Sequence, residues 1–216
     1  MTKKQKEILD RLADKYGLEP EVTLDYKEPF QLLIATILSA QCTDDRVNIV
    51  TKDLFKKYTS IEDFAAAELA ELEQDIKPCG FYHAKAVHII ECAQKLIKDF
   101  GGEVPSSIEG LTSLSGVGRK TANVVRTHIF HEPSIVVDTH VKRISARLGF
   151  TKETDPVKIE FDLMKKLPKE RWSALNLQLI YHGRAICTSR SPKCEECFLS
   201  DLCPKKSLSN RQVNLP

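Results

Sequence analysis

The sequence of 216 residues predicts an all-α fold. Apolar residues recur at steps of three and four over most of the chain, and strict alternation of apolar and polar residues is scarce. Residues that cap or stop helices stand where these patterns begin and end. With 42% hydrophobic and 29% charged residues, the chain has enough apolar material for one large or two small domains. No apolar run approaches the roughly 20 residues needed to cross a bilayer, so we expect no membrane partner.

The first part of the chain predicts a series of short helices. Residues 30–38 are apolar on almost every side, which suits a helix at the centre of a bundle. Residues 47–55 carry a one-sided apolar stripe. Ser60 and Asp63 form a capping box that opens the next helix, and the Lys-Pro-Cys-Gly segment at 77–80 is a stop signal.

The remaining helices are bounded by clear start and stop signals. A long helix with an apolar stripe between residues 87 and 100 ends at the glycine pair 101–102. The Asp-Pro pair at 155–156 supplies an N-cap and a first helical residue, and residues 172–186 form the last long amphipathic stretch. The loop at 131–134 is the nearest candidate for a domain boundary. The apolar stripe of the long helix comprises Val87, Ile90, Leu96, Ile97 and Phe100.

Basic residues are concentrated in two segments. The formal net charge is only +2, but residues 110–131 contain three basic residues and no acidic one, and residues 139–147 do likewise. Such segments are either solvated faces or surfaces that bind an anionic partner. The charged N-terminus lacks the features of a secretory signal, which predicts a cytoplasmic protein.

Four of the seven cysteines lie within 17 residues, with the spacing C-x6-C-x2-C-x5-C. Disulfides are disfavoured in a cytoplasmic protein with a large core. Structural zinc usually takes two close cysteine pairs, whereas only one is present here, so zinc stays open as an alternative. Four thiolates in one compact loop match the one ligand per iron that a [4Fe–4S] cluster needs, and this is the favoured interpretation. The four residues are Cys187, Cys194, Cys197 and Cys203.

A Gly-Val-Gly turn lies between two helical patterns. Gly116 and Gly118 permit backbone angles closed to other residues and let a ligand approach the main chain. The N–H groups of the turn and the start of the next helix form a site for phosphate oxygens. The alternative is an ordinary turn between helices.

Lys120 and Asp138 are the candidate reactive groups. Lys120 stands in the first turn of a helix beside Arg119, and both surroundings favour the neutral amine that attacks a sugar carbon. A surface lysine that binds phosphate is the alternative. Asp138 follows an apolar run, which predicts partial burial, and it stands at the start of a helix as an N-cap. Its carboxylate could also take a proton or stabilise a sugar cation.

In this order, the motifs resemble those of the endonuclease III family of helix-hairpin-helix DNA glycosylases with abasic-site lyase activity. The similarity runs from about Phe30 to Cys203. It is carried by Leu38-Ser39-Ala40-Gln41-Cys42-Thr43-Asp44, Gly116-Val117-Gly118-Arg119-Lys120-Thr121-Ala122, Val137-Asp138-Thr139-His140, His182-Gly183-Arg184 and the cysteine loop.

The resemblance implies an all-α fold of two lobes. Residues 22–132 would form a six-helix barrel with a helix-hairpin-helix at about 108–127, and residues 1–21 plus 133–216 would form the iron–sulfur cluster domain. The implied partner is double-stranded DNA that contains a damaged pyrimidine or an abasic site. We expect a monomer with modest positive charge, associated with the nucleoid.

The resemblance also implies roles for individual residues. Lys120 would attack the sugar C1′ and Asp138 would be its acidic partner, so that an oxidised pyrimidine is removed and the strand is then cut by β-elimination. The four cysteines would hold a [4Fe–4S] cluster. Gln41 and Phe81 would fill the space left by the turned-out base. The DNA-contacting residues would be Gln41, Phe81, Gly116, Val117, Gly118, Arg119, His140, Arg184, Arg190 and Lys193.

The chain departs from the family pattern at two positions. Ser115 replaces a common proline, which would loosen the turn, and Phe81 replaces a usual leucine. Three alternatives remain at this point: the related adenine-mismatch glycosylase, a non-catalytic DNA-binding module with zinc, and a redox sensor. The first relies on a glutamate in the early buried helix, but Gln31 to Thr43 contains no carboxylate.

Overall fold

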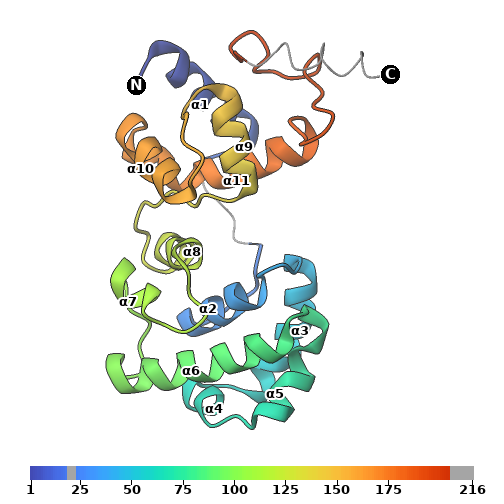
Figure 1. The fold of residues 1–216 in the computed structure, drawn as a ribbon, viewed down its shortest axis with the longest axis vertical. Coiled ribbons are helices and arrows are strands. Elements are labelled where there is room, and N and C mark those ends of the chain that lie inside the picture. The colour runs from blue at the N-terminus through green and yellow to red at the C-terminus, as the bar shows by residue number, and fades with distance from the viewer. Residues whose placement is uncertain (19–22, 205–216) are drawn as a thin grey trace. The chain divides into compact units, whose positions relative to one another are not determined.

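The computed structural model describes residues 1–18 and 23–204, and within these ranges it contains helices, turns and loops but no strand (Figure 1). The prediction of an all-α fold is confirmed. The chain divides into two compact units: residues 21–132 form one, and residues 1–20 together with 133–216 form the other. Among the described helices, none combines the length and the apolar character needed to cross a membrane.

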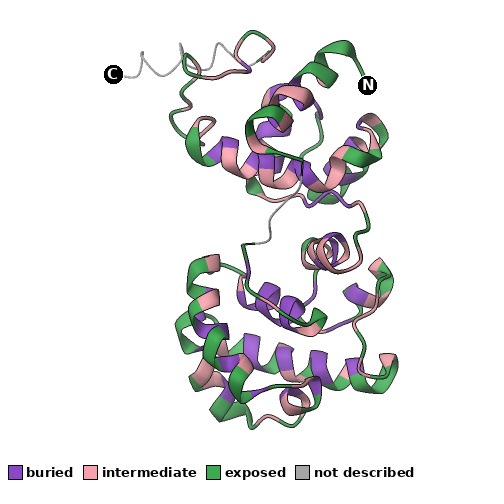
Figure 2. Ribbon diagram, turned by 180° about the vertical axis from the view of Figure 1, so that it is seen from behind, coloured by how far each residue is buried: buried purple, intermediate pink, exposed green. Residues whose placement is uncertain are grey.

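The unit of residues 21–132 is built around α2 (Pro29–Leu38). Every residue of α2 from Gln31 to Leu38 is buried, as its continuous apolar run predicts (Figure 2). The helix packs against three others of its unit. The elements that follow α2 are α3 (Asp44–Lys57), α4 (Ile61–Ala65), α5 (Leu69–Ile76), the 3₁₀ turn η1 (Lys77–Cys79), α6 (Tyr82–Phe100), α7 (Ile108–Thr112) and α8 (Arg119–Ile129).

The second unit joins the two ends of the chain. In it, α1 (Lys3–Tyr16) packs against α11 (Trp172–Ala185). Arg11 of α1 donates to the Phe198 carbonyl over 2.9 Å and to Asp201 Oδ1 over 2.8 Å. Residues 186–204, which follow α11, form turns rather than helices. The remaining helices of the unit are α9 (Thr139–Leu148), α10 (Pro156–Lys166) and the short η2 (Lys169–Arg171).

The predicted helix boundaries are confirmed at several caps. Ser60 and Asp63 form the capping box of α4, and Asp155 caps α10 with Pro156 at its first position. Gly101 ends α6 in the left-handed region, with φ of 64°. These local hydrogen bonds satisfy backbone groups at the helix ends, and this explains why short-range patterns located them.

The buried face of α6 differs from the predicted stripe. The helix begins at Tyr82, and two residues of the predicted stripe, Val87 and Ile97, are each 38% exposed. The face that packs into the core combines small residues and one lysine with Ile89 and Leu96, and of the predicted stripe only Leu96 belongs to it. Its buried residues are Lys85, Ala86, Ile89, Cys92, Ala93 and Leu96.

Gly183 allows α9 and α11 to approach each other closely. A Cβ at this position would overlap His140 Nδ1 and would lie 2.9 Å from both Arg143 Nη2 and Ile144 Cδ1. Gly183 is buried within α11, so the contact is part of the core of its unit.

We expect Gly183→Ala to lower the free energy of unfolding by about 1–3 kcal/mol, because the added methyl group displaces three packed side chains. In most helix interiors the same change stabilises by roughly 0.5–1 kcal/mol. Urea unfolding of both forms at pH 7 measures the difference, and a stabilised variant would contradict the packing argument.

Candidate functional site

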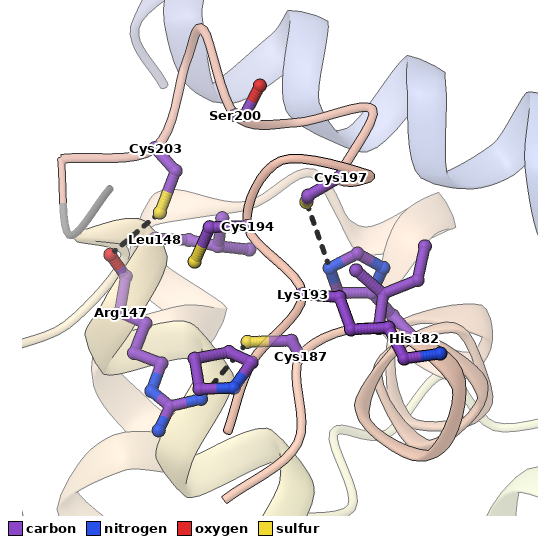
Figure 3. A pocket seen from close by; sticks show the side chains of 11 residues that line it. Arg147, Leu148, His182, Cys187, Lys193, Cys194, Cys197, Ser200 and Cys203 are labelled. Atoms are coloured by element: carbon purple, nitrogen blue, oxygen red, sulfur yellow. Dashed lines mark hydrogen bonds between the residues drawn. The ribbon is translucent and has the colours of Figure 1, made fainter. Parts of the chain in front are cut away.

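The four clustered cysteines line one cavity in the unit that contains both chain ends. Cys187 follows α11, and the other three lie on the turns after it. Arg147, Leu148 and His182 complete much of the wall, and the four sulfur atoms turn toward the space that they line (Figure 3). All four thiols are half-buried, and none forms a disulfide.

Two arginines of α9 bind the loop that carries the cysteines. Arg147 Nη1 donates to Cys187 Sγ over 3.3 Å and to the Thr188 carbonyl over 2.7 Å, and its Nη2 donates to the Ser189 carbonyl over 2.9 Å. Arg143 Nη2 donates to the Cys187 carbonyl over 3.1 Å. Both arginines belong to the basic segment 139–147. Because their guanidinium groups bind the cysteine loop of the same unit, these two side chains are not part of a solvated face.

His182 lies on the opposite wall of the cavity. Its Nε2 is 3.7 Å from Cys197 Sγ, and its Nδ1 is 3.3 Å from the Tyr16 hydroxyl. Burial lowers the pKa of His182 to about 4, so the ring is neutral at pH 7. Burial also raises the pKa of the Cys197 thiol.

The donor set and its surroundings fit an iron–sulfur cluster. Four cysteines provide one thiolate for each iron of a cubic cluster, and Arg147 offers a hydrogen bond and positive charge to one of them. Cys187, Cys197 and Cys203 pack against an apolar core. Within residues 1–18 and 23–204, no three His, Cys, Asp or Glu side chains are grouped so as to hold a single metal ion, whereas the four cysteines line one shared cavity.

The hairpin between α7 and α8 has one glycine that the backbone requires. Gly116 has φ of 74°, and a Cβ there would lie 2.8 Å from His88 Cβ. Gly118 was expected to adopt a similarly restricted conformation, but its φ is −83° and no atom lies within 4 Å of its Cβ position. The prediction of a special backbone conformation is therefore wrong for Gly118, although the open space beside it leaves the main chain accessible.

Ser115 attaches the hairpin to α6. Its hydroxyl donates to Glu91 Oε2 over 2.6 Å and lies 2.9 Å from His88 Nδ1. These contacts hold the turn at the position where the sequence comparison with the family pattern predicted loosening.

Lys120 is exposed at the second position of α8, one residue after Arg119. The N-cap of this helix, Gly118, has no side chain to accept from the first N–H groups. Val117 is only 5% exposed, so only its backbone is available to a ligand.

Asp138 caps α9 in the other unit. Its Oδ1 accepts from the Val141 N–H over 2.8 Å, and the residue is half-buried after the buried segment 134–136. Both the N-cap and the partial burial predicted for Asp138 are confirmed.

The predicted DNA-contacting residues differ in their exposure. Gln41 and Phe81 are exposed, as are Arg184, Arg190 and Lys193. His140 is half-buried, and its Nδ1 lies 3.2 Å from Arg143 Nη2. Burial is the main cause of its lowered pKa.

Sequence reasoning did not identify Arg143, Arg147 or His182 as neighbours of the cysteines. The two arginines were visible only as part of a basic segment, and a charge pattern does not distinguish solvent from carbonyl partners. The four-residue spacing of the two arginines, which places them on one face of α9, is the signal that could have found them.

Comparison with known proteins adds independent findings. Residues 34–169 match the model of the HhH-GPD superfamily base excision DNA repair protein, and residues 187–203 match the iron-sulfur binding domain of endonuclease III. Endonuclease III of Synechocystis sp. is 48% identical over 212 residues, which cover 97% of each chain.

Two solved structures are similar over nearly the whole chain. A non-covalent endonuclease III–DNA complex has a TM-score of 0.89, and a trapped endonuclease III–DNA covalent intermediate has a TM-score of 0.88. Each is 44% identical and covers 99% of this chain and 100% of its own.

We expect Arg147→Met to lose iron and sulfide to a chelator at least about tenfold faster than the parent protein, because loss of an outer-shell hydrogen bond weakens metal sites. Iron and acid-labile sulfide per chain measure the loss over time. Lys142→Met is the control, since Lys142 is exposed on the same helix. Equal retention in the two variants would contradict a role for the Arg147–Cys187 contact.

The two hairpin glycines provide a matched pair. We expect Gly116→Ala to lower the free energy of unfolding by about 2–4 kcal/mol, because left-handed strain adds to the contact with His88. We expect Gly118→Ala to cost less than about 1 kcal/mol. Urea unfolding of both variants measures the contrast, and similar losses would show that the conformation of Gly116 is not the deciding factor.

Proposed function

The chain belongs to the endonuclease III family of the HhH-GPD superfamily, and on that premise we propose that Lys120 and Asp138 are its catalytic residues. The protein is a DNA glycosylase and abasic-site lyase of base excision repair. It carries a [4Fe–4S] cluster and acts on DNA. Its substrate would be an oxidised pyrimidine in duplex DNA, or the abasic site that follows base loss, and it would act at the nucleoid in the cytoplasm.

Lys120 would supply the attacking amine. The Nζ lone pair forms a bond to the sugar C1′ as the bond to the damaged base breaks, and the base leaves with the bonding electron pair and takes up a proton. Loss of the amine proton and opening of the sugar ring yield a Schiff base. Removal of a C2′ proton then expels the 3′ phosphate and cuts the strand. The exposure of Lys120 at an open helix start supports this assignment.

Asp138 would act on the same sugar through its carboxylate. The half-buried group can accept the proton released by the Lys120 amine or stabilise positive charge at C1′. Its hydrogen bond to the Val141 N–H holds it at the start of α9 in one orientation. Because only Oδ1 accepts from the Val141 N–H, Asp138 can cap α9 and act on the sugar at the same time.

DNA would be bound through backbone groups and exposed cations. The hairpin at 108–127, within a barrel domain of residues 22–132, would place its N–H groups on phosphate oxygens. Arg184, Arg190 and Lys193 would contact the backbone from the cluster domain, which comprises residues 1–21 plus 133–216. Gln41 and Phe81 would fill the gap left by the turned-out base.

The cluster would be held by Cys187, Cys194, Cys197 and Cys203. When bound, it supplies a rigid cross-link of the loop rather than a group that reacts with DNA. Arg147 and Arg143 hold the same loop from α9, and Arg190 and Lys193 lie on it. The cysteine loop would therefore present these two cations to the phosphate backbone.

Two of the three alternative functions, the adenine-mismatch glycosylase and the non-catalytic DNA-binding module, are not favoured. Adenine-mismatch glycosylases rely on a glutamate in the early buried helix, and Gln31 to Thr43 contains none. A non-catalytic module has no need of a nucleophilic lysine. The observation that carries the proposal is the family match over 34–169, which includes Lys120 and Asp138.

We expect Lys120→Gln to bind a duplex with a tetrahydrofuran abasic analogue within about threefold of the parent, but to lose strand cutting and borohydride trapping by at least roughly 10³-fold. Duplexes with thymine glycol, 8-oxoguanine and an A·G mismatch measure the lesion preference. Lys98→Gln, an exposed lysine on α6, should leave all of these unchanged. Persistent trapping of Lys120→Gln would move the nucleophile elsewhere.

Asp138→Asn separates the two roles of the carboxylate. Asparagine is also a good N-cap, so we expect the free energy of unfolding to change by less than about 1 kcal/mol while the trapping rate falls by roughly 10²-fold. Urea unfolding and single-turnover trapping measure the two quantities. A large loss of stability with unchanged trapping would leave only the capping role.

A further inference from the structure

Gln41 and Phe81 share an uncommon backbone conformation. Their φ angles are 57° and 50°, and in the described part of the chain only His131 is a further non-glycine residue with positive φ. Gln41 lies in the turn after α2, and Phe81 is the N-cap of α6. Both residues are exposed, Phe81 by 65%. Residues in sparsely populated backbone regions keep them only where the surroundings hold them, and they concentrate at functional sites.

A single buried lysine connects the two turns. Lys85 is 4% exposed, and its Nζ donates to the Leu38 carbonyl over 2.8 Å and to the Cys79 carbonyl over 2.9 Å. Its backbone N–H also donates to the Phe81 carbonyl over 3.1 Å. Leu38 is three residues before Gln41, and Cys79 is two residues before Phe81. Lys85 therefore binds the chain on the approach to each turn.

The ammonium group is held by carbonyl oxygens alone. Among the described residues, Lys85 forms no ion pair, and the neighbouring thiols are those of Cys42 and Cys79. The Leu38 carbonyl lies at the C-terminal end of α2, where the helix dipole favours a cation. Burying an ammonium without a carboxylate is costly, and an aliphatic side chain would fill the space without that cost. What only the ammonium provides is the simultaneous contact with both turns.

We propose that Lys85 is a positioning residue for damage recognition. Its ammonium holds the turns of Gln41 and Phe81 at a set separation. Both turns are therefore already ordered before DNA binds, and both side chains can enter the gap left by a turned-out base. Pre-ordering of this kind strengthens binding to damaged DNA and has no effect on the attack at C1′. This inference depends on the gap-filling role proposed above for Gln41 and Phe81.

The experiment compares the affinity for damaged DNA with the rate of chemistry in Lys85→Met, which keeps the length of the side chain but not its charge. We expect the dissociation constant for a tetrahydrofuran duplex to rise about tenfold, and that for an undamaged duplex to change by less than about twofold. The single-turnover trapping rate on abasic DNA at saturating enzyme should stay within about threefold of the parent. Lys85→Arg, which keeps a cation, should recover part of the affinity.

Two controls separate positioning from general stability. Lys95→Met removes another ammonium from α6, one that pairs with Asp99. We expect no change in the affinity for the tetrahydrofuran duplex or for the undamaged duplex. Cys92→Ala leaves a cavity in the buried face of the same helix, seven residues after Lys85, where Cys92 is 1% exposed. The positioning role is overturned if Cys92→Ala lowers both the melting temperature and the affinity for the tetrahydrofuran duplex as much as Lys85→Met does.

The decisive measurement repeats Lys85→Met in a Gln41→Ala/Phe81→Ala background. If Lys85 acts through these side chains, its substitution adds less than about twofold there. An undiminished tenfold effect overturns the inference and leaves the gap-filling role intact. If Gln41→Ala/Phe81→Ala alone binds tetrahydrofuran DNA like the parent, the proposed gap-filling role fails, and the inference fails with it. If Lys85→Met does not fold, Lys85→Gln takes its place in every arm.

Discussion

Most of the reactive and DNA-contacting groups proposed for this protein lie at or beside the ends of helices. In each unit the helices pack into the core through their buried faces, and their termini carry the backbone groups that no helix can satisfy internally. Lys120 stands at the start of α8, Asp138 at the start of α9 and Phe81 at the start of α6. Gln41 and Cys187 follow the ends of α2 and α11. An all-α enzyme for a polyanion can therefore combine dipoles, open N–H groups and reactive side chains at the same places.

Local patterns in the sequence located the helix ends well. The caps at Ser60, Asp138 and Asp155 depend on side chains that bond to the backbone within three residues, so their signal is complete in a short segment. The burial of α2 was equally clear from its continuous apolar run. The family motifs then connected these elements to DNA repair, which neither composition nor net charge could do.

The predictions that failed depend on contacts between distant segments. The inner face of α6 includes Lys85, and a lysine reads as a surface residue unless the carbonyls that receive it are known. Arg143 and Arg147 read as part of a basic surface, but their partners are carbonyls and a thiol some forty residues away in sequence. Gly118 and Gly116 are the same residue type, and only the backbone angles show that Gly116 needs to be glycine and Gly118 does not. For Lys85 and the two arginines the sequence shows the residue type but not its partner, and for Gly118 it shows the residue type but not the backbone angles.

The unit that holds the cysteines is assembled from both ends of the chain, and this has a consequence for synthesis on the ribosome. The inner face of α1, with Ile8, Leu9 and Leu12, packs with side chains of α9, α10 and α11, and Arg11 bonds to residues near 200. At translation rates of about 5–20 residues per second, α1 emerges roughly 10–40 s before its last partners exist. Residues 21–132 are complete well before that. During synthesis the apolar face of α1 therefore stays exposed, and accessible to chaperones, until residues near 200 have been made.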